Sequence, residues 1–182
     1  HSFGKMHKAK LDAAFGCIPD ISEIFSEEVE IYDWGCGQGT ASVCLLDFLH
    51  SKNISPNIKH FCLVEPSIAA VERATQVIES FCSAYFVKSI TKDFDSLSPE
   101  DFKKSNIRKV HLFSNILDVE AFDLARFIHL FQQLFGSDNY FVCVGPYYSN
   151  NRRVDEFVAA TAPDIMYVTM NKERGTWQGD WT

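Results

Sequence analysis

Three glycines at alternate positions follow an acidic residue at the end of an apolar segment, and this is where the sequence points most directly to chemistry. The segment 29–34 is largely apolar and contains Asp33, and Gly35, Gly37 and Gly39 come directly after it. Glycines at this spacing let the backbone turn sharply and approach a ligand with no Cβ in the way. Because an apolar run follows, the turn is expected to open a helix whose first N–H groups can meet a ligand. The acid can accept a hydrogen bond from a cationic or hydroxylated ligand.

Two classes of cofactor site use such a turn. A dinucleotide site needs its third glycine three positions after the second, but Thr40 stands there, which disfavours a nicotinamide-dependent oxidoreductase. The pattern Asp-x-Gly-x-Gly-x-Gly instead resembles motif I of the class I S-adenosylmethionine-dependent methyltransferases. The resemblance implies that the turn lies under the methionine part of S-adenosylmethionine, with these residues binding the cofactor: Asp33, Gly35, Cys36, Gly37, Gln38 and Gly39.

Strand-like and helix-like segments alternate along the chain, which predicts an α/β protein with a mostly parallel sheet. Strands are predicted over 29–34, 60–65, 84–90, 107–114, 140–145 and 164–170, and helices over 5–15, 20–28, 40–50, 66–81, 119–135 and 151–161, with a short helix after Ser98-Pro99.

This order also resembles the class I methyltransferases. It implies a Rossmann-like three-layer α/β/α sandwich with six or seven strands and helices on both faces. We expect residues 1–28 to form an N-terminal helical lid or cap and residues 29–182 to form the methyltransferase-like domain. A seventh strand would begin near Thr176, so it is either short or lies beyond Thr182.

Ligands of an open parallel sheet bind beyond the carboxyl ends of its strands, so the residues that follow each strand are the candidates. Glu65 and Pro66 follow the second strand. An acid there resembles motif II, which implies that Glu65 holds the two ribose hydroxyls, since a carboxylate offers two acceptors. Alternatively, Glu65 is only an acid at the start of the following helix, where the helix dipole favours a negative charge. The resemblance also implies that Asp93, after the third strand, contacts the adenine amino group of the cofactor. Asp95 is the other candidate for this contact.

The fourth strand leads into Ser114-Asn115-Ile116, which is similar to the family segment of the type Ser-Asn-Val-Leu-His. The resemblance implies that these three residues line the methionine end of the cofactor. Asp118 takes the position that histidine often holds, and it is expected either to act as a base or to cap the helix 119–135.

The implied reaction is displacement at the sulfonium methyl by an O, N, S or C nucleophile of a substrate, which proximity alone can drive. Asp118, Tyr147 and His111 are the catalytic candidates, with Asp118 and Tyr147 ahead of His111, and Tyr147 could equally be a packing residue. His111, in mid-strand, is expected to be a packed or hydrogen-bonded core histidine. Motifs of amino-methylating DNA enzymes and of cytosine-C5 enzymes are absent. A degenerate cofactor-binding or scaffold domain of a larger protein is the competing interpretation.

The composition restricts the partners. The net charge of −7 over 182 residues argues against a broad basic face for nucleic acid. A small-molecule or protein acceptor therefore fits best, and an RNA acceptor would need a basic surface from another domain. The six cysteines show no metal-ligand spacing, so we expect no metal site and reduced thiols. No run is long enough to span a membrane, and we expect a cytoplasmic protein. Two groups of basic residues, expected to be solvated, are Lys103, Lys104, Arg108 and Lys109, and Arg152 with Arg153.

Overall fold

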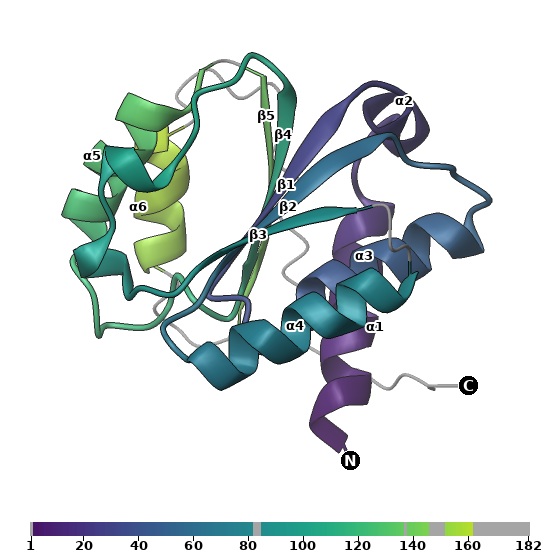
Figure 1. The fold of residues 1–182 in the computed structure, drawn as a ribbon, viewed down its shortest axis with the longest axis horizontal. Coiled ribbons are helices and arrows are strands. Elements are labelled where there is room, and N and C mark those ends of the chain that lie inside the picture. The colour runs from purple at the N-terminus through teal and green to yellow at the C-terminus, as the bar shows by residue number, and fades with distance from the viewer. Residues whose placement is uncertain (1, 82–84, 137, 146–151, 162–182) are drawn as a thin grey trace.

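Five parallel strands form one sheet between two layers of helices (Figure 1). The computed structural model describes residues 2–81, 85–136, 138–145 and 152–161. The helices are α1 (Ser2–Gly16), α2 (Ile21–Ser26), α3 (Thr40–Ser51), α4 (Ile68–Phe81), α5 (Leu124–Leu134) and α6 (Arg152–Thr161), with two short 3₁₀ turns, η1 (Phe94–Ser96) and η2 (Pro99–Asp101). The strands are β1 (Val29–Trp34), β2 (Ile58–Val64), β3 (Phe86–Ile90), β4 (Arg108–Ser114) and β5 (Asn139–Val144).

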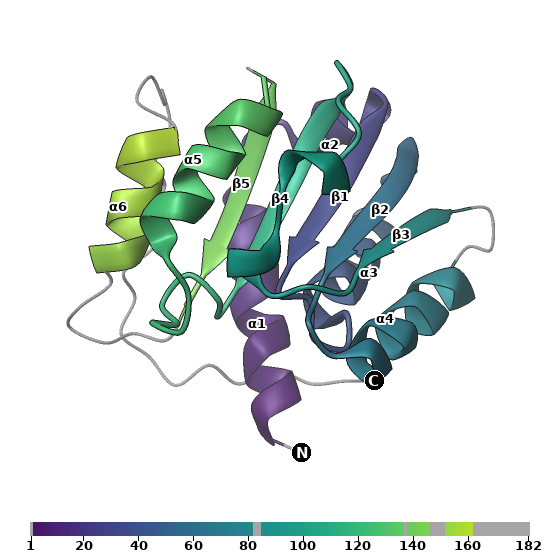
Figure 2. The same ribbon diagram turned by 60° about the vertical axis from the view of Figure 1, so that its left-hand side comes forward.

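The strands lie in the order β3-β2-β1-β4-β5 and all pair in parallel. The chain moves outward from β1 to β3 and then returns to the other side of β1 for β4 and β5. The strand order therefore reverses between β1 and β4, which is where ligands bind in open α/β sheets. Figure 2 shows the five arrowheads at one edge of the sheet. The α/β expectation is confirmed, and the strands predicted at 164–170 and near Thr176 lie outside the described residues.

The two faces of the sheet bury different kinds of side chain. Helices α1, α3 and α4 cover one face (Figure 1) with a mainly aliphatic core that includes Leu45, Leu49 and Val71. Helices α5 and α6 cover the other face, where the core is aromatic and surrounds Trp34 and Phe127, whose ring centroids are 5.2 Å apart. The phenylalanine-rich composition is thus concentrated on one side of the sheet. Since both faces are covered, all six residues of β1 are buried.

Helix α5 begins later than the sequence pattern predicts. Its first residue is Leu124, not a residue near 119, and its N-cap is Asp123, whose Oδ1 accepts a hydrogen bond from the Arg126 N–H (3.0 Å). Phe122 is buried in the aromatic core just before this cap. The prediction that Asp118 caps this helix is therefore wrong, because the chain first packs Phe122 inward and only then turns into the helix.

Helix α1 packs as a full member of the aliphatic layer. Leu11 and Phe15 are buried, and the ring of Phe15 lies 5.6 Å from that of Phe48 in α3. Lys8 forms an ion pair with Asp47 of α3. The N-terminal half of α1 projects past the carboxyl edge of the sheet (Figure 2). The lid function expected of residues 1–28 remains a prediction.

Candidate functional site at the carboxyl edge of the sheet

Backbone hydrogen bonds join the loops that follow β1, β2 and β4 to the last residues of the neighbouring strands. Each bond extends the sheet ladder just beyond a strand end, and together they hold three loops in one layer. These bonds run from Cys36 N–H to Val64 O (3.1 Å), from Glu65 N–H to Ile90 O (3.1 Å) and from Asn115 N–H to Val144 O (2.7 Å). The loops that carry most of the predicted cofactor residues are therefore fixed side by side at the switch point.

The glycine turn has the left-handed conformation that its sequence requires. Gly35, Gly37 and Gly39 have φ values of 63°, 51° and 81°, which residues with a Cβ rarely adopt. A Cβ on Gly35 would lie 2.7 Å from the side chain of Ile116, and one on Gly39 would lie 3.0 Å from Ala74 in α4. A Cβ on Gly37 would meet no atom of the described residues within 4 Å. The middle glycine therefore borders open space, whereas the outer two allow close packing.

Asp33 is turned into the protein. It is 1% exposed, and its Oδ2 accepts hydrogen bonds from the Ser42 hydroxyl (2.6 Å) and the Ser42 N–H (3.2 Å). The carboxylate thus fixes the first turn of α3 below the glycine turn. Burial raises the pKa of Asp33 to about 6, while the bonds from Ser42 oppose that rise. Direct contact between Asp33 and a cofactor remains a prediction, and the role of Ser42 was missed from the sequence.

Glu65 bridges two of the loops. Its Oε2 accepts a hydrogen bond from the Gly37 N–H (3.1 Å) and its Oε1 accepts one from the Ser67 N–H (3.0 Å). The side chain is half-buried and follows β2 directly. Its two carboxylate oxygens are therefore held next to the open side of the glycine turn, where the sequence predicts the ribose. Pro66, which follows Glu65 in the chain, and Gln38, which follows Gly37, are exposed.

The acids after β3 serve as local caps. Asp93 is exposed, and its Oδ1 accepts a hydrogen bond from the Ser96 N–H (2.8 Å), which begins η1. Hydrogen bonds from the Ser96 hydroxyl and the Ser96 N–H lower the pKa of Asp93. The half-buried Asp95 accepts a bond from the Asp123 N–H (2.9 Å). The adenine contact expected of Asp93 remains a prediction, and Asp95 is committed to the loop before α5.

Asn115 is the most strongly fixed residue of the loop after β4. It has a left-handed backbone (φ 56°), and its Nδ2 contacts His7 Nδ1 (3.0 Å) and Ser114 Oγ (3.3 Å). Its Oδ1 accepts a bond from Lys10 Nζ (3.4 Å), which also donates to Gly145 O (2.8 Å). Two residues of α1 thus reach the predicted methionine end of the cofactor. Sequence reasoning missed both, although their i, i+3 spacing places them on one helix face.

The catalytic candidates have different outcomes. Asp118 is half-buried, and its Oδ1 would lie 3.7 Å from a Cβ on Gly145, so it stays close to the predicted site. Tyr147 lies outside the described residues. His111 is fully buried, accepts a hydrogen bond from Trp34 Nε1 (3.2 Å) and contacts Asn139 Oδ1 through Nε2 (3.0 Å). Burial lowers its pKa to about 3. It is therefore a core histidine, as expected.

Cys36 lies in the glycine turn but is buried. Burial and the nearby Asp33 and Glu65 carboxylates raise the pKa of its thiol, so it is not a reactive thiolate. Within the described segments, no three His, Cys, Asp or Glu side chains are grouped so that they could hold a metal ion.

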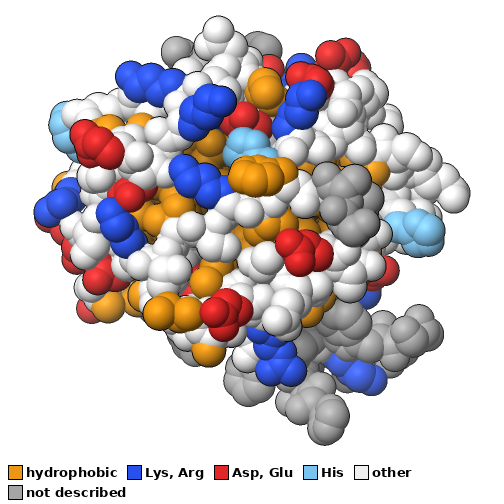
Figure 3. Space-filling model, viewed as in Figure 1, with side chains coloured by type: hydrophobic (Ala, Val, Ile, Leu, Met, Phe, Trp, Pro, Cys, Tyr) orange, Lys and Arg blue, Asp and Glu red, His pale blue; other side chains and the backbone are white. Residues whose placement is uncertain are grey.

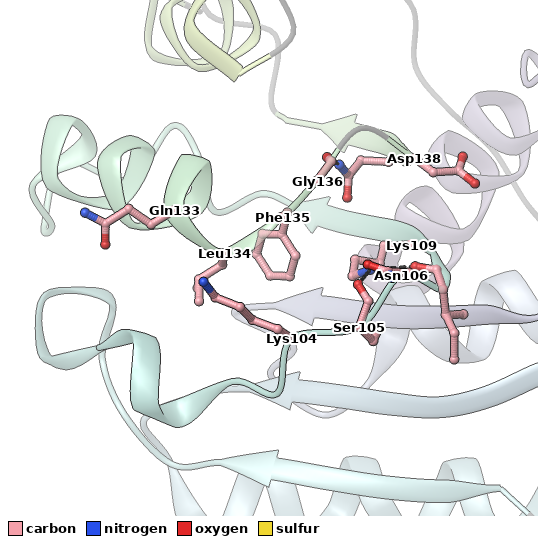
Figure 4. A pocket seen from close by; sticks show the side chains of 11 residues that line it. Lys104, Ser105, Asn106, Lys109, Gln133, Leu134, Phe135, Gly136 and Asp138 are labelled. Atoms are coloured by element: carbon pink, nitrogen blue, oxygen red, sulfur yellow. Dashed lines mark hydrogen bonds between the residues drawn. The ribbon is translucent and has the colours of Figure 1, made fainter.

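A cavity of about 470 Å³ lies at the opposite edge of the sheet, at the amino ends of the strands (Figure 4). It is lined by the end of α5 and by the segment that leads into β4. Beside it, Lys109 donates a hydrogen bond to Ser105 O (2.9 Å) and lies 3.9 Å from the buried Glu30 carboxylate. This cavity is therefore separate from the predicted cofactor site.

The basic groups of the sequence do not form a broad basic face. Lys109 is buried, and Arg108 pairs with Asp138 at 3.2 Å. Arg153 donates two hydrogen bonds to backbone carbonyls and lies over the ring of Phe122, 4.8 Å from its centroid. Figure 3 shows acidic and basic side chains mixed over the face in view. No helix of the described residues has the length and apolar character needed to cross a membrane.

Comparisons with known proteins give a structural match without a sequence match. No family model matches the chain, and no curated protein does so either. Among solved structures, the YcgJ protein of Bacillus subtilis is 16% identical, with a TM-score of 0.52 over 80% of this chain and 56% of that one. StiE O-MT (its residues 942–1257) is 11% identical, with a TM-score of 0.51 over 82% and 48%.

A chain of the Haloferax volcanii complex that contains the Trm112 methyltransferase activator is 18% identical, with a TM-score of 0.50 over 84% of this chain and 58% of that one. The chain spans about half the length of the solved structures that it matches. At such identities the similarity concerns the fold alone. The described sheet and its helices have the Rossmann-like fold of the class I S-adenosylmethionine-dependent methyltransferases.

Proposed function

We propose that this protein binds S-adenosylmethionine at the carboxyl edge of β1 and β2 and transfers its methyl group to an O, N, S or C nucleophile of an acceptor. The observation that carries the proposal is the pairing of Gly37 with Glu65. The glycine faces a space in which a Cβ would meet no atom of the described residues within 4 Å, and its N–H is bound to the carboxylate predicted to hold the ribose. A ligand can therefore approach the backbone next to an acceptor pair suited to a vicinal diol.

The residues present fit this cofactor along its length. Under this proposal Glu65, after β2, holds the ribose, and the turn at Gly37 lies under the methionine part. Asn115 and Ile116 stand at the end of β4, on the far side of β1 from Glu65, where the methyl group would face an acceptor. This extended arrangement supports S-adenosylmethionine over a nicotinamide dinucleotide, whose pyrophosphate needs a different glycine spacing.

The bound cofactor supplies an activated methyl on a sulfonium, which is a good leaving group. The protein then acts mainly by holding acceptor and methyl in line. In this proposal Asp118 takes a proton where the acceptor must lose one; it lies half-buried beside Gly145 at the end of β5. An acceptor that is a small molecule or a protein is favoured by the net charge of −7.

Calorimetric titration with S-adenosylmethionine, S-adenosylhomocysteine and NADH tests the cofactor. We expect binding of the first two only, and Glu65→Ala should weaken it by about 1–3 kcal/mol through the lost ribose bonds. Ser67→Ala is the matched control, because the bond to Glu65 comes from the Ser67 backbone N–H and survives the change. Binding of NADH alone, or an undiminished affinity in Glu65→Ala, would contradict the assignment.

Methyl transfer is tested separately from binding. Incubation with methyl-labelled S-adenosylmethionine and a panel of small-molecule and protein acceptors should yield a labelled product and S-adenosylhomocysteine. Tight binding of the cofactor with no transfer to any acceptor would instead favour a scaffold domain that has retained the cofactor site.

A further inference from the structure

Lys10 of α1 is a cation held against neutral groups. Its ammonium donates to the Gly145 carbonyl (2.8 Å) and to the Asn115 side-chain oxygen (3.4 Å). The side chain is half-buried. In the part of the chain that the structure describes, no carboxylate lies within ion-pair distance of it, and Asp118 acts on it only from farther away. Partial burial of an ammonium without an adjacent anion costs desolvation energy that a bound anion would recover.

Lys8, two residues earlier on the same helix, shows the contrast. Its ammonium pairs with Asp12 at 3.1 Å and with Asp47 of α3. Its charge is therefore neutralised within the fold, and the charge ties α1 to α3. Lys10 does not play this structural role, because its two hydrogen bonds go to loops at the edge of the sheet.

The position of Lys10 assigns it to the acceptor side of the site. Its two partners, Asn115 and Gly145, follow β4 and β5. The groups proposed for the cofactor's sugar and methionine, Glu65 and the glycine turn, follow β2 and β1. Because the order is β2-β1-β4-β5 across the sheet, Lys10 lies beyond the predicted methyl group, on the side from which an acceptor must approach.

The groups around Lys10 are preorganised, in that their hydrogen bonds are already formed without a ligand. Because the ammonium can only donate, Asn115 must present Oδ1 to it, which leaves Nδ2 as the donor to His7 Nδ1. The backbone N–H of Asn115 is also bound, to Val144 O (2.7 Å). Asn115 is thus held by β5 and by two residues of α1 in a left-handed conformation (φ 56°). Such conformations persist where the surroundings fix them, and they concentrate at functional sites.

We propose that Lys10 recognises a negatively charged oxygen group, a carboxylate or a phosphate, on a small-molecule acceptor. The inference rests on the proposed function, because it places the acceptor next to the transferable methyl. His7 and Asn115 are positioning residues that hold the ammonium at the ends of β4 and β5. The acceptor is then an organic acid or a phosphate ester whose nucleophile lies a short distance from its anionic group.

The experiment follows the lysine side chains by NMR in the protein saturated with S-adenosylhomocysteine. Inorganic phosphate and acetate are titrated in at constant ionic strength. We expect the Lys10 ε-methylene signal to move along a saturable curve while that of Lys8 stays in place. Lys10→Met should weaken phosphate binding about tenfold or more, the loss expected for a charge-assisted hydrogen bond. Lys8→Met is the control: it removes the charge of the other lysine on the same helix and should leave phosphate binding intact.

Three results would overturn the inference. They are a non-saturable shift shared by all lysines, an unchanged phosphate affinity in Lys10→Met, and exclusion of phosphate by S-adenosylhomocysteine but not by 5′-methylthioadenosine. The last would assign the anion to the cofactor's own carboxylate. Failure of the wild-type protein to bind S-adenosylhomocysteine would instead contradict the proposed function, and the two failures are therefore distinguishable.

Discussion

Gly37→Ala separates the folding of the glycine turn from its use as a binding surface. The new Cβ would meet no atom of the described residues within 4 Å, so it creates no clash inside the protein. Its structural cost is the left-handed backbone alone (φ 51°), about 1–2 kcal/mol. For a protein of 182 residues this corresponds to a decrease in Tm of about 2–8 °C. The variant should therefore stay folded and keep the bond from its N–H to Glu65.

Gly37→Ala should weaken cofactor binding by more than its loss of folding stability indicates. If the methionine part packs on the turn, the methyl group takes space that the ligand needs. Overpacking of this kind costs about 1–3 kcal/mol, which weakens binding roughly 5- to 150-fold. The assay is calorimetric titration with S-adenosylhomocysteine, with the fold of the variant checked by circular dichroism and thermal unfolding.

Asn53→Ala is the matched control. Asn53 has the same kind of backbone (φ 56°) but follows α3, at the end of the helix far from the glycine turn. It should lose stability to a similar extent and bind the cofactor normally. If Gly37→Ala is folded and binds S-adenosylhomocysteine within about twofold of the wild type, the cofactor does not lie on this turn and the reasoning is refuted.

Three further predictions concern the residues that support the site. Gly39→Ala should cost about 2–5 kcal/mol, the sum of backbone strain and overpacking, because its Cβ would lie 3.0 Å from Ala74. Urea unfolding should show this loss, with partial recovery on adding Ala74→Gly; full stability of Gly39→Ala would contradict the close packing. Ser42→Ala removes the hydroxyl bonded to the Asp33 carboxylate (2.6 Å) and should cost about 1–3 kcal/mol at pH 8. The loss should shrink at pH 5, where Asp33, with a pKa of about 6, is mostly protonated; an equal loss at both pH values argues against a buried charge. His111→Gln should remove the contribution that destabilises the folded protein below pH 6.5, so between pH 6 and pH 4 the variant should gain stability as the pH falls while the wild type changes little; identical pH profiles of the two proteins would rule out this role for His111.

The last two predictions concern buried groups with opposite effects on stability. In the unfolded chain His111 takes up a proton below its ordinary pKa of 6.5, but in the folded protein it stays neutral down to about 3. The unfolded state binds more protons in that range, so stability falls there by about 1.4 kcal/mol per pH unit. Asp33 has a folded pKa of about 6 against an ordinary 3.8. The folded state binds more protons between those values, so this group makes the protein more stable as the pH falls. Between pH 6 and pH 4 the two contributions largely cancel.

The sequence by itself determined the class of fold and the backbone geometry of two segments of the candidate site, the glycine turn and the residue that follows β2. Hydrophobic periodicity is a local property of the chain, so the alternation of strands and helices, and with it the parallel α/β sheet, could be predicted from one sequence. The spacing of Gly35, Gly37 and Gly39 required a left-handed turn, and the position of Glu65 after a strand placed it at the carboxyl edge. These features depend on backbone geometry over a few residues, which is why they could be predicted.

The tertiary structure alone decided which groups meet. Asp33 turns inward instead of outward, because hydrogen bonds from the hydroxyl and N–H of Ser42 at the start of α3 offset the desolvation of its carboxylate. Asp123 caps α5 in place of Asp118, because Phe122 is first buried in the aromatic core. Lys10 and Asn115 are 105 positions apart, and only the packing of α1 against α3 and β5 brings them together. Contacts between residues so distant in the sequence leave no local pattern, and it is on these contacts that the proposed acceptor side of the site depends.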